Sequence, residues 1–369
     1  MKKSTSAIAS CVFALGLVVP GVCASLTSDM KEGKPAFRAM SQLAFGPEGV
    51  LFIADTKAAA ITAIATGDTQ AAGASAALKA EAIDEKIAAL LGTKADDIVI
   101  EDLAVNPISR QAYIAVSRGK GPDAVPVLVR VKAGGQPELV SLDKVRFSRA
   151  ELPDPAADVA PVPGKKQQNR RLEAITDIAY VDGKVLVAGL SNEEFASSLR
   201  AIAFPFKAVD RGTSVEIYHA AHGAFETRSP VRTFIAYKVG QEQHLLAAYT
   251  CTPLVQFALN DLKPGAKIMG KTIAEFGNGN RPLDIVVYQK DGKDFLLMAN
   301  NNRGVIKFAA DQINGAASIT TRVANTEGLK FEKLDWAGVK QLDLLDNRHA
   351  LVLRGAAGQP QVLETLALP

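Results

Sequence analysis

Residues 41–56 read SQLAFGPEGVLFIADT, and the fold follows from this stretch. A short apolar segment at 41–45 leads into the turn GPEG at 46–49 and then into a second apolar segment, which ends at Asp55. Two apolar segments joined by a turn that contains Gly and Pro are typical of a β-hairpin. A third apolar segment, AITAIAT at 60–66, predicts another strand beside the second.

The same pattern recurs along the rest of the chain. Five more copies occur, at residues 101–119, 175–192, 232–251, 283–302 and 340–355. Equivalent apolar positions are spaced by 60, 75, 57, 51 and 56 residues, and they are Leu43, Leu103, Ile178, Ile235, Val286 and Leu342. Several copies continue into a fourth apolar segment, at 137–142, 214–220, 271–276 and 318–324.

Four short strands in a unit of about fifty residues make one blade of a β-propeller, and each blade needs neighbours to bury its faces. The repeats therefore predict an all-β fold, with residues 25–369 forming a single β-propeller domain of six blades. Seven blades is the alternative.

Two insertions interrupt the repeat. Residues 67–97 are rich in alanine, and apolar residues at helical spacing predict a short helix on the rim near 79–92. Residues 148–172 contain several prolines and a basic end, which predicts a long surface loop.

The first 24 residues have the format of a cleaved secretory signal peptide. Lys2 and Lys3 precede an apolar run at 7–19, and small residues end the segment at Ala24. The run is too short to span a bilayer comfortably, and no later stretch is long enough, so we expect no integral membrane segment. This format predicts a bacterial protein that is periplasmic or secreted. Cleavage leaves Cys251 as the single cysteine, which excludes an internal disulfide.

Composition narrows the function classes. The chain has 42 Lys and Arg against 39 Asp and Glu, so a strongly basic nucleic-acid-binding protein is excluded. Hydrophobic residues make up 48% of the 369 residues, which excludes a disordered chain. We expect a monomer.

The first repeat, LAFGPEGVLFIADTKAAAITAI at 43–64, resembles the NHL repeat and repeats of the senescence-marker-protein and gluconolactonase superfamily. The resemblance implies a six-bladed propeller. Its lactonase branch implies a divalent metal ion on the central axis, held by Glu, Asn and Asp side chains from different blades. Glu48 does not match that position, because it lies in a turn on the opposite face. Residues of the right type elsewhere are Glu101, Asp102, Glu173, Asp177, Asn192, Asp284 and Asn300.

One face of the predicted propeller is rich in polar loops. In a propeller, the loops that enter the innermost strands and the loops that join the second and third strands open on the same face. The residues predicted to bind there are Asp102, Glu173, Asp177, Asn192, Arg281, Asp284, Asn300 and Arg303. Converging charged and amide groups suit a polar ligand or a loop of a partner protein. Loop residues are commonly polar without any such role.

A second candidate site combines His219, His222 and Cys251. Two imidazoles and a thiolate are a ligand set for copper or zinc. However, H-x-x-H spacing places both rings on one side only in a helix, and residues 214–220 are predicted to be a strand. A small buried cysteine is the alternative interpretation.

Other motifs carry no chemistry. GAKIMGKT at 265–272 fits the phosphate-binding P-loop pattern, but no helix is predicted to follow it. Catalytic signatures are otherwise lacking, so the leading hypothesis is an exported, non-enzymatic propeller that binds a partner protein or a small polar ligand. The first alternative is a metal-dependent hydrolase of the lactonase type, and the second is a periplasmic copper- or zinc-binding protein. The cofactor is left open, with one divalent metal ion as the candidate.

Overall fold

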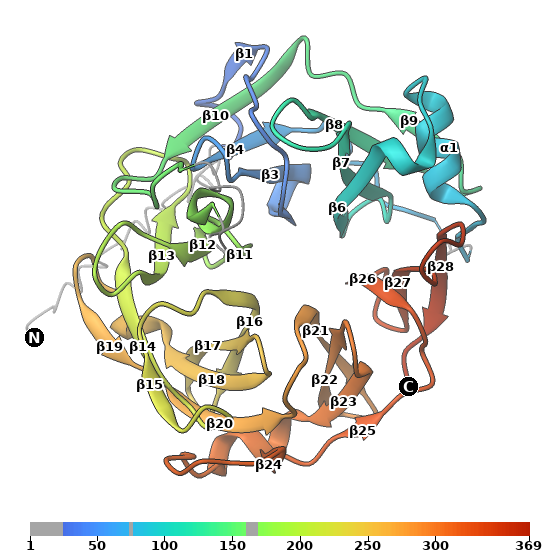
Figure 1. The fold of residues 1–369 in the computed structure, drawn as a ribbon. Helices are drawn as coiled ribbons and strands as arrows, with labels where there is room; N and C mark the ends of the chain where they lie inside the picture. The colour runs from blue at the N-terminus through green and yellow to red at the C-terminus, as the bar shows by residue number, and fades with distance from the viewer. Residues whose placement is uncertain (1–24, 74–76, 160–168) are drawn as a thin grey trace, which may run out of the picture.

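The computed structural model describes residues 25–73, 77–159 and 169–369. The predicted signal peptide at 1–24 lies outside these residues. Six sheets of mainly antiparallel strands are arranged as blades around a central axis, and the first strands face that axis (Figure 1). The structure confirms the predicted all-β propeller with six blades.

The blades are numbered in chain order. Blade 1 contains β2 (Leu43–Phe45), β3 (Val50–Asp55) and β4 (Ala60–Ala65), with β10 (Val145–Glu151) and β1 (Lys31–Gly33) outside them. Blade 2 contains β6 (Ile98–Val105), β7 (Ala112–Arg118), β8 (Val125–Val131) and β9 (Pro137–Leu139). Blade 3 contains β11 (Asp177–Val181), β12 (Lys184–Leu190), β13 (Ser197–Ala203), β14 (Thr213–His219), β15 (Ala224–Glu226) and β19 (Lys267–Met269).

The remaining blades follow the same plan. Blade 4 contains β16 (Val231–Val239), β17 (Glu242–Tyr249), β18 (Pro253–Ala258), β20 (Lys271–Phe276) and β24 (Thr326–Gly328). Blade 5 contains β21 (Pro282–Lys290), β22 (Lys293–Asn300), β23 (Gly304–Ala309) and β25 (Glu332–Lys333). Blade 6 contains β26 (Val339–Leu344), β27 (His349–Arg354), β28 (Val362–Ala367) and β5 (Lys79–Ala80).

Helices are few and short. The α-helix α1 spans Ile83–Leu90. Short 3-10 helices are η1 (Pro47–Gly49), η2 (Ala95–Asp97), η3 (Arg170–Glu173), η4 (Leu259–Asp261) and η5 (Ala310–Gly315). Within the described ranges, no helix is long and apolar enough to cross a membrane.

The blades do not follow one another around the ring in chain order. The innermost strand of blade 1, β2, contacts β11 of blade 3 on one side and β6 of blade 2 on the other. The strand β6 also contacts β26 of blade 6. The spatial order is therefore 1–3–4–5–6–2, so blade 2 lies between the first and the last blade (Figure 1).

This order arises because blade 2 is inserted into blade 1. The chain leaves blade 1 after β4 and forms β5, which pairs with β28 of blade 6 through Ala80 and Leu363. It then forms α1 and blade 2, and it returns as β10 to complete blade 1, where Phe147 pairs with Ile64. Ile83 and Ile87 of α1 are buried in a core shared by blades 2 and 6. Burying each such side chain contributes about 1.5–3 kcal/mol, which ties the inserted unit to the ring.

The two predicted insertions need correction. The helix predicted near 79–92 forms only over α1, because residues 79–80 are the strand β5. The loop predicted at 148–172 is wrong at its start, because residues 148–151 belong to β10. Only Phe147 and Ala150 of this strand are buried, since it lies near the outer edge of its sheet, and the apolar alternation is correspondingly weak.

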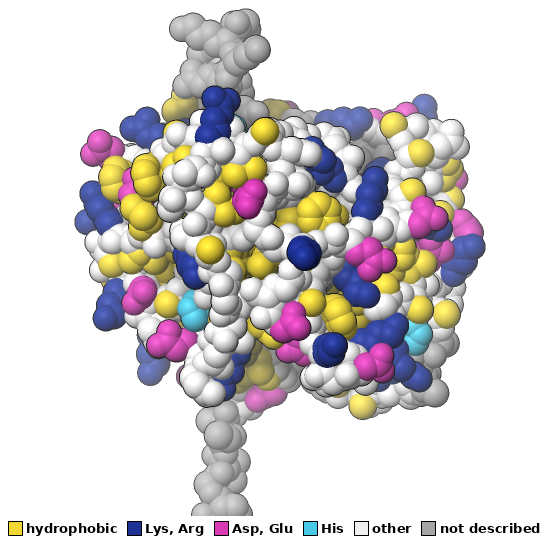
Figure 2. Space-filling view, turned by 90° about the horizontal axis from the view of Figure 1, so that it is seen from below, with side chains coloured by type: hydrophobic (Ala, Val, Ile, Leu, Met, Phe, Trp, Pro, Cys, Tyr) yellow, Lys and Arg dark blue, Asp and Glu magenta, His cyan; other side chains and the backbone are white. Residues whose placement is uncertain are grey.

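Not all of the predicted fourth segments of the repeat form strands. The segment at 318–324 is not a strand, and the two-residue strand β25 takes its place in blade 5. The segment at 265–272 covers β19 and the start of β20, so a strand and not a helix follows the P-loop-like sequence. The expectation that no helix follows it is confirmed. Basic and acidic side chains are interspersed on one side of the molecule (Figure 2), in keeping with the nearly balanced charge.

Candidate functional site

A pocket of about 420 Å³ lies on the axis of the propeller, and all six inner strands line it. Equivalent positions of neighbouring strands stand side by side, so one end of each strand faces the same mouth of the pocket. The residues at the start of the strands are polar: Gln42, Glu101, Thr176, Arg232, Arg281 and Lys340. The residues at the other end are mostly apolar: Phe45, Pro107, Tyr180, Ile235, Val286 and Leu344. The mouth formed by the polar residues is on the loop-rich face.

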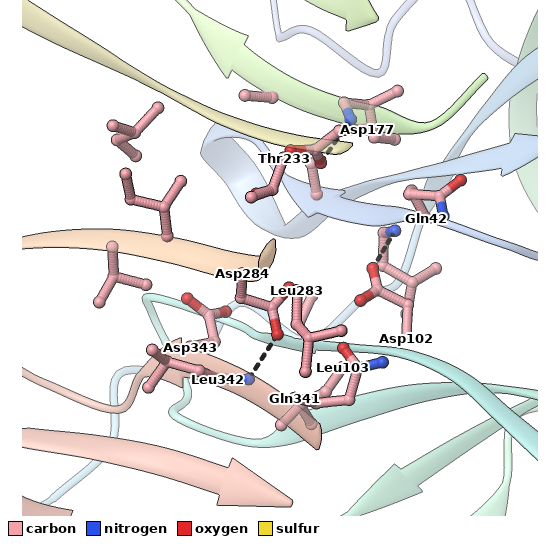
Figure 3. A pocket seen from close by; sticks show the side chains of 18 of the residues that line it. Gln42, Asp102, Leu103, Asp177, Thr233, Leu283, Asp284, Gln341, Leu342 and Asp343 are labelled. Carbon is pink, nitrogen blue, oxygen red and sulfur yellow. Dashed lines mark hydrogen bonds between the residues drawn. The ribbon is translucent and has the colours of Figure 1, made fainter. Parts of the chain in front are cut away.

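Four aspartates, the axial aspartates, line the pocket: Asp102, Asp177, Asp284 and Asp343. Each accepts a hydrogen bond from a backbone amide of a neighbouring blade. The N–H of Leu43 donates to Asp102 at 2.7 Å, and the N–H of Leu342 donates to Asp284 at 2.8 Å (Figure 3). Phe234 donates to Asp177 and Val105 donates to Asp343, each at 2.7 Å. These four carboxyl groups therefore join adjacent blades.

The environment of the axis favours protonated carboxyl groups. Burial raises the pKa of Asp177 to about 7 and the pKa of Asp343 to about 6, against the hydrogen bonds that they accept. Burial, and then the repulsion of Asp284, raises the pKa of Asp102 well above its usual range. The pKa of Asp284 is raised in the same way, by burial and by the charges of Asp177 and Asp343. Like charges in a low-dielectric site resist ionising together.

The mouth of the pocket carries three basic side chains, Arg232, Arg281 and Lys340, beside the carboxyl groups of Glu101 and Glu173. Arg232 forms an ion pair with Glu173, with 2.8 Å between Nη1 and Oε1. Arg281 keeps contact with solvent, and no hydrogen bond or ion pair of its guanidinium is found in the described part of the chain. Partial burial and the charge of Arg232 lower the pKa of Arg281. Two uncharged groups at the same mouth, Gln42 Oε1 and Thr176 Oγ1, are buried without a hydrogen-bond partner among the described residues.

Only some of the residues predicted for the loop-rich face lie at the axial pocket. Asp102, Asp177, Asp284 and Arg281 line the pocket, and Glu173 contacts it through Arg232.

The other three residues lie outside the pocket lining. The N–H of Asn192 donates to the Asp154 carbonyl at 3.0 Å. Asn300 is buried, and its Oδ1 atom accepts a hydrogen bond from the side-chain amide of Asn280 at 2.9 Å. The Arg303 guanidinium donates to the Asn278 carbonyl and to Asn325.

Sequence reasoning missed Asp343, Gln42, Thr176 and Arg232. The repeat gave no signal for Asp343, because the strand pairings align Asp284 with Gln341 and place Asp343 two residues further along its strand. Gln42, Thr176 and Arg232 have no signal either, because their residue types differ from blade to blade.

The second predicted set, His219, His222 and Cys251, lies between blades 3 and 4 and outside the axial pocket. Its three potential ligand atoms lie within 4.8 Å of one another. Among the described residues, this is the one group of three or more His, Cys, Asp or Glu side chains that meets that distance. The axial aspartates do not form such a group.

Comparisons with known proteins leave the family open. No protein-family model matches the sequence, and no curated protein matches it. Solved structures that match include the PQQ-bound aldose sugar dehydrogenase of Streptomyces coelicolor, at 13% identity and a TM-score of 0.32, covering 91% of this chain and 97% of that one.

Two further solved structures match at a similar level. A putative oxidoreductase (glucose dehydrogenase) of Thermus thermophilus matches at 12% identity and a TM-score of 0.34, covering 91% of this chain and 100% of that one. Raptor of Chaetomium thermophilum matches at 11% identity and a TM-score of 0.38, covering 92% of this chain and 29% of that one. At these levels no activity, cofactor or family is transferred to this chain.

Proposed function

We propose that this propeller binds a small polar ligand with an anionic group in its axial pocket. The observation that carries the proposal is the Arg281 guanidinium at the mouth of the pocket, which has no partner among the described residues. Its neighbour Arg232 is already paired with Glu173. A carboxylate or phosphate that enters the pocket would give Arg281 an anionic partner. Guanidinium groups bind such anions through two parallel hydrogen bonds.

The uncharged polar atoms at the mouth favour hydroxyl groups on the same ligand. Gln42 Oε1 and Thr176 Oγ1 are buried without partners in the described part of the chain, and leaving a buried polar group unpaired costs about 1–3 kcal/mol. A ligand hydroxyl would satisfy them. Deeper in the pocket, the pKa of the Asp177 carboxyl is about 7, so near neutral pH it is present in both the donating and the accepting form. The proposed class of ligand is a small carboxylate that bears hydroxyl groups.

Calorimetric titration with acetate, lactate and gluconate tests the proposal. We expect gluconate to bind more tightly than acetate, since only the former offers both kinds of group. Arg281→Ala should weaken binding about 10–100-fold, which is the range expected for a lost charge-assisted hydrogen bond. Arg118→Ala is the matched control, because Arg118 is exposed at the end of β7 on the same face and does not line the pocket. Equal binding by both variants would overturn the proposal.

The other functional hypotheses stay predictions. A partner protein on the loop-rich face, a lactonase-type metal site on the axis and the NHL-like family resemblance are each untested by the structure. The same holds for a periplasmic or secreted location, which depends on residues 1–24.

A further inference from the structure

Three potential metal ligands meet at the rim of the propeller, where blade 3 packs against blade 4. His219 is the last residue of β14, and His222 lies in the turn between β14 and β15. Cys251 lies in the turn between β17 and β18. None of the three lines the axial pocket, so this site is independent of the ligand proposed above.

The turn after β14 explains how both imidazoles reach one side. The amides of His222 and Gly223 donate to the His219 carbonyl at 3.1 and 2.8 Å, which winds the chain as in one turn of a helix. Residues three apart then lie on the same side. The two ring centroids are 3.8 Å apart. The strand-like sequence thus ends at His219, where the helical spacing begins.

A single carboxylate orients both rings. His219 Nδ1 lies 3.0 Å from Glu226 Oε2, and His222 Nδ1 lies 2.6 Å from Glu226 Oε1. The Ser229 hydroxyl also donates to this carboxylate. With the Ser229 hydroxyl donating to it, the carboxylate offers its oxygen atoms as acceptors, so we infer that each Nδ1 carries a proton.

This hydrogen bonding leaves both Nε2 atoms for another partner. In His219 the Nε2 atom is buried and has no hydrogen-bond partner among the described residues. A carboxylate on one ring nitrogen and a metal ion on the other is the usual arrangement around protein metal ions, since the carboxylate fixes the tautomer and the ring orientation. The orphan nitrogen is thus the atom to which an ion would bind.

The backbone at Cys251 is held in an unfavourable conformation. Cys251 and Thr252 have φ angles of +65° and +60°, in the left-handed region that favours glycine. The turn is fixed by the Cys251 amide, which donates to the Asn280 carbonyl at 2.7 Å, and by the Thr252 hydroxyl, which donates to the Gly277 carbonyl at 2.8 Å. Strain of this kind is concentrated at functional sites. Here it presents a thiol to the two imidazoles.

A second carboxyl group accepts hydrogen bonds from the turn that follows β14. Glu275 is fully buried, and its Oε1 atom accepts from the amides of Ala220 and Ala221 at 2.9 and 3.2 Å. Its other oxygen has no partner among the described residues. A cation bound by the two histidines would stabilise the ionised form of this buried carboxyl group.

We propose that His219, His222 and Cys251 bind one zinc(II) or copper(I) ion through the two Nε2 atoms and the Sγ atom. Thiolate and imidazole ligands select these soft or borderline ions over calcium and magnesium, which take oxygen ligands. Zinc bonds of about 2.0–2.3 Å place neighbouring ligand atoms roughly 3.3–3.8 Å apart. One ring nitrogen of each histidine and the Cys251 Sγ atom already lie within 4.8 Å of one another. The His222 side chain is 51% exposed, which gives the ion a route of entry.

The test is a titration of chelator-stripped, untagged protein with each ion in competition with a chromophoric chelator, copper(I) being titrated without oxygen. The wild-type protein should bind one equivalent of at least one of the two ions. Comparison of the zinc(II) and copper(I) titrations shows which ion binds more tightly. Cys251→Ser and His222→Ala should each weaken binding at least 10-fold, and Glu226→Gln should weaken it about 10–100-fold. His244→Ala is the control, since His244 lies near the start of β17, at the opposite end of that strand from Cys251, where its ring hydrogen-bonds to the Glu242 carbonyl.

Cobalt(II) provides a readout that a merely structural role would not change. A thiolate-to-cobalt absorption band should appear in the wild-type protein and be absent in Cys251→Ser, while both proteins keep the same circular dichroism spectrum. Equal affinity of the wild-type protein and Cys251→Ser for both ions would overturn the proposal. So would a failure of the wild-type protein to bind either ion.

Discussion

The axis and the rim of this propeller both use buried carboxyl groups, but for opposite purposes. On the axis, the carboxyl group of Asp284 accepts a hydrogen bond from a backbone amide of the next blade, and burial beside other aspartates raises its pKa. At the rim, Glu226 accepts from two imidazoles and a hydroxyl, and its pKa falls to about 2. The difference shows that burial beside like charges favours the protonated form of a carboxyl group, whereas several side-chain donors favour the ionised form. The axial groups serve assembly, whereas the rim group holds two imidazoles in place.

Removing an axial acceptor should have the largest effect on stability. In Asp284→Ala the amide of Leu342 loses its partner at the junction of blades 5 and 6. We expect the free energy of unfolding to fall by about 2–3 kcal/mol in urea titrations. Asp284→Asn keeps one acceptor oxygen and should cost less than about 1 kcal/mol. Equal losses in the two variants would mean that the charge, and not the hydrogen bond, joins the blades.

The pH dependence of stability should separate the two regions. The pKa of Asp177 is raised to about 7 and that of Asp343 to about 6, so the folded state binds more protons than the unfolded state between about pH 4 and pH 7. The free energy of unfolding should therefore fall as pH rises through this window. Urea titrations at several pH values measure it.

Two comparisons sharpen this result. Asp284→Asn should make the decline shallower, because it removes one carboxyl group with a raised pKa and the charge that repels Asp102. The rim acts in the other direction: the pKa of Glu226 is lowered, so its contribution is lost only as pH falls below about 4.5 toward 2. Stability that rises steadily from pH 4 to pH 7 would contradict the assignment of the axial carboxyl groups.

The smallest effect is expected at the rim in the absence of metal. Glu226→Gln keeps an acceptor for one imidazole, and the His222 ring that it contacts is half exposed. We expect the metal-free variant to lose less than about 1 kcal/mol of unfolding free energy, measured in urea with a chelator present. A loss as large as that of Asp284→Ala would show that Glu226 supports the fold in the same way as the axis.

Local pattern was enough to predict the blades but not their order. Each hairpin is encoded in about fifteen consecutive residues, as in 41–56, so the repeat could be counted from sequence. The position of blade 2 depends on the pairing of β5 with β28 and of β10 with β4. These pairings join segments that are distant in the sequence, and β5 is only two residues long, so no periodic pattern predicts them.

The candidate sites were predictable to different degrees. Asp102, Asp177 and Asp284 were found because topology alone brings the starts of the inner strands together. Asn300 and Arg303 were expected on the same face, yet their hydrogen bonds are made to other loops. His219, His222 and Cys251 were noticed for their chemistry, while the helical turn that unites them could not be inferred from strand-like residues. Glu226 and Glu275 had no signal, because their roles depend on contacts across two blades.

The insertion of blade 2 into blade 1 has a consequence for how the chain matures during synthesis. The amide of Val105 in blade 2 donates to Asp343 of blade 6, a partner 238 positions further along the chain. The ribosome makes blade 6 long after blade 2, so one flank of blade 2 stays uncovered until residue 343 has emerged. A nascent chain stopped before β26 would expose the apolar side of blade 2 and of α1 together. Ring closure therefore waits for blade 6, and any factor that shields apolar surface on growing chains would find a target there.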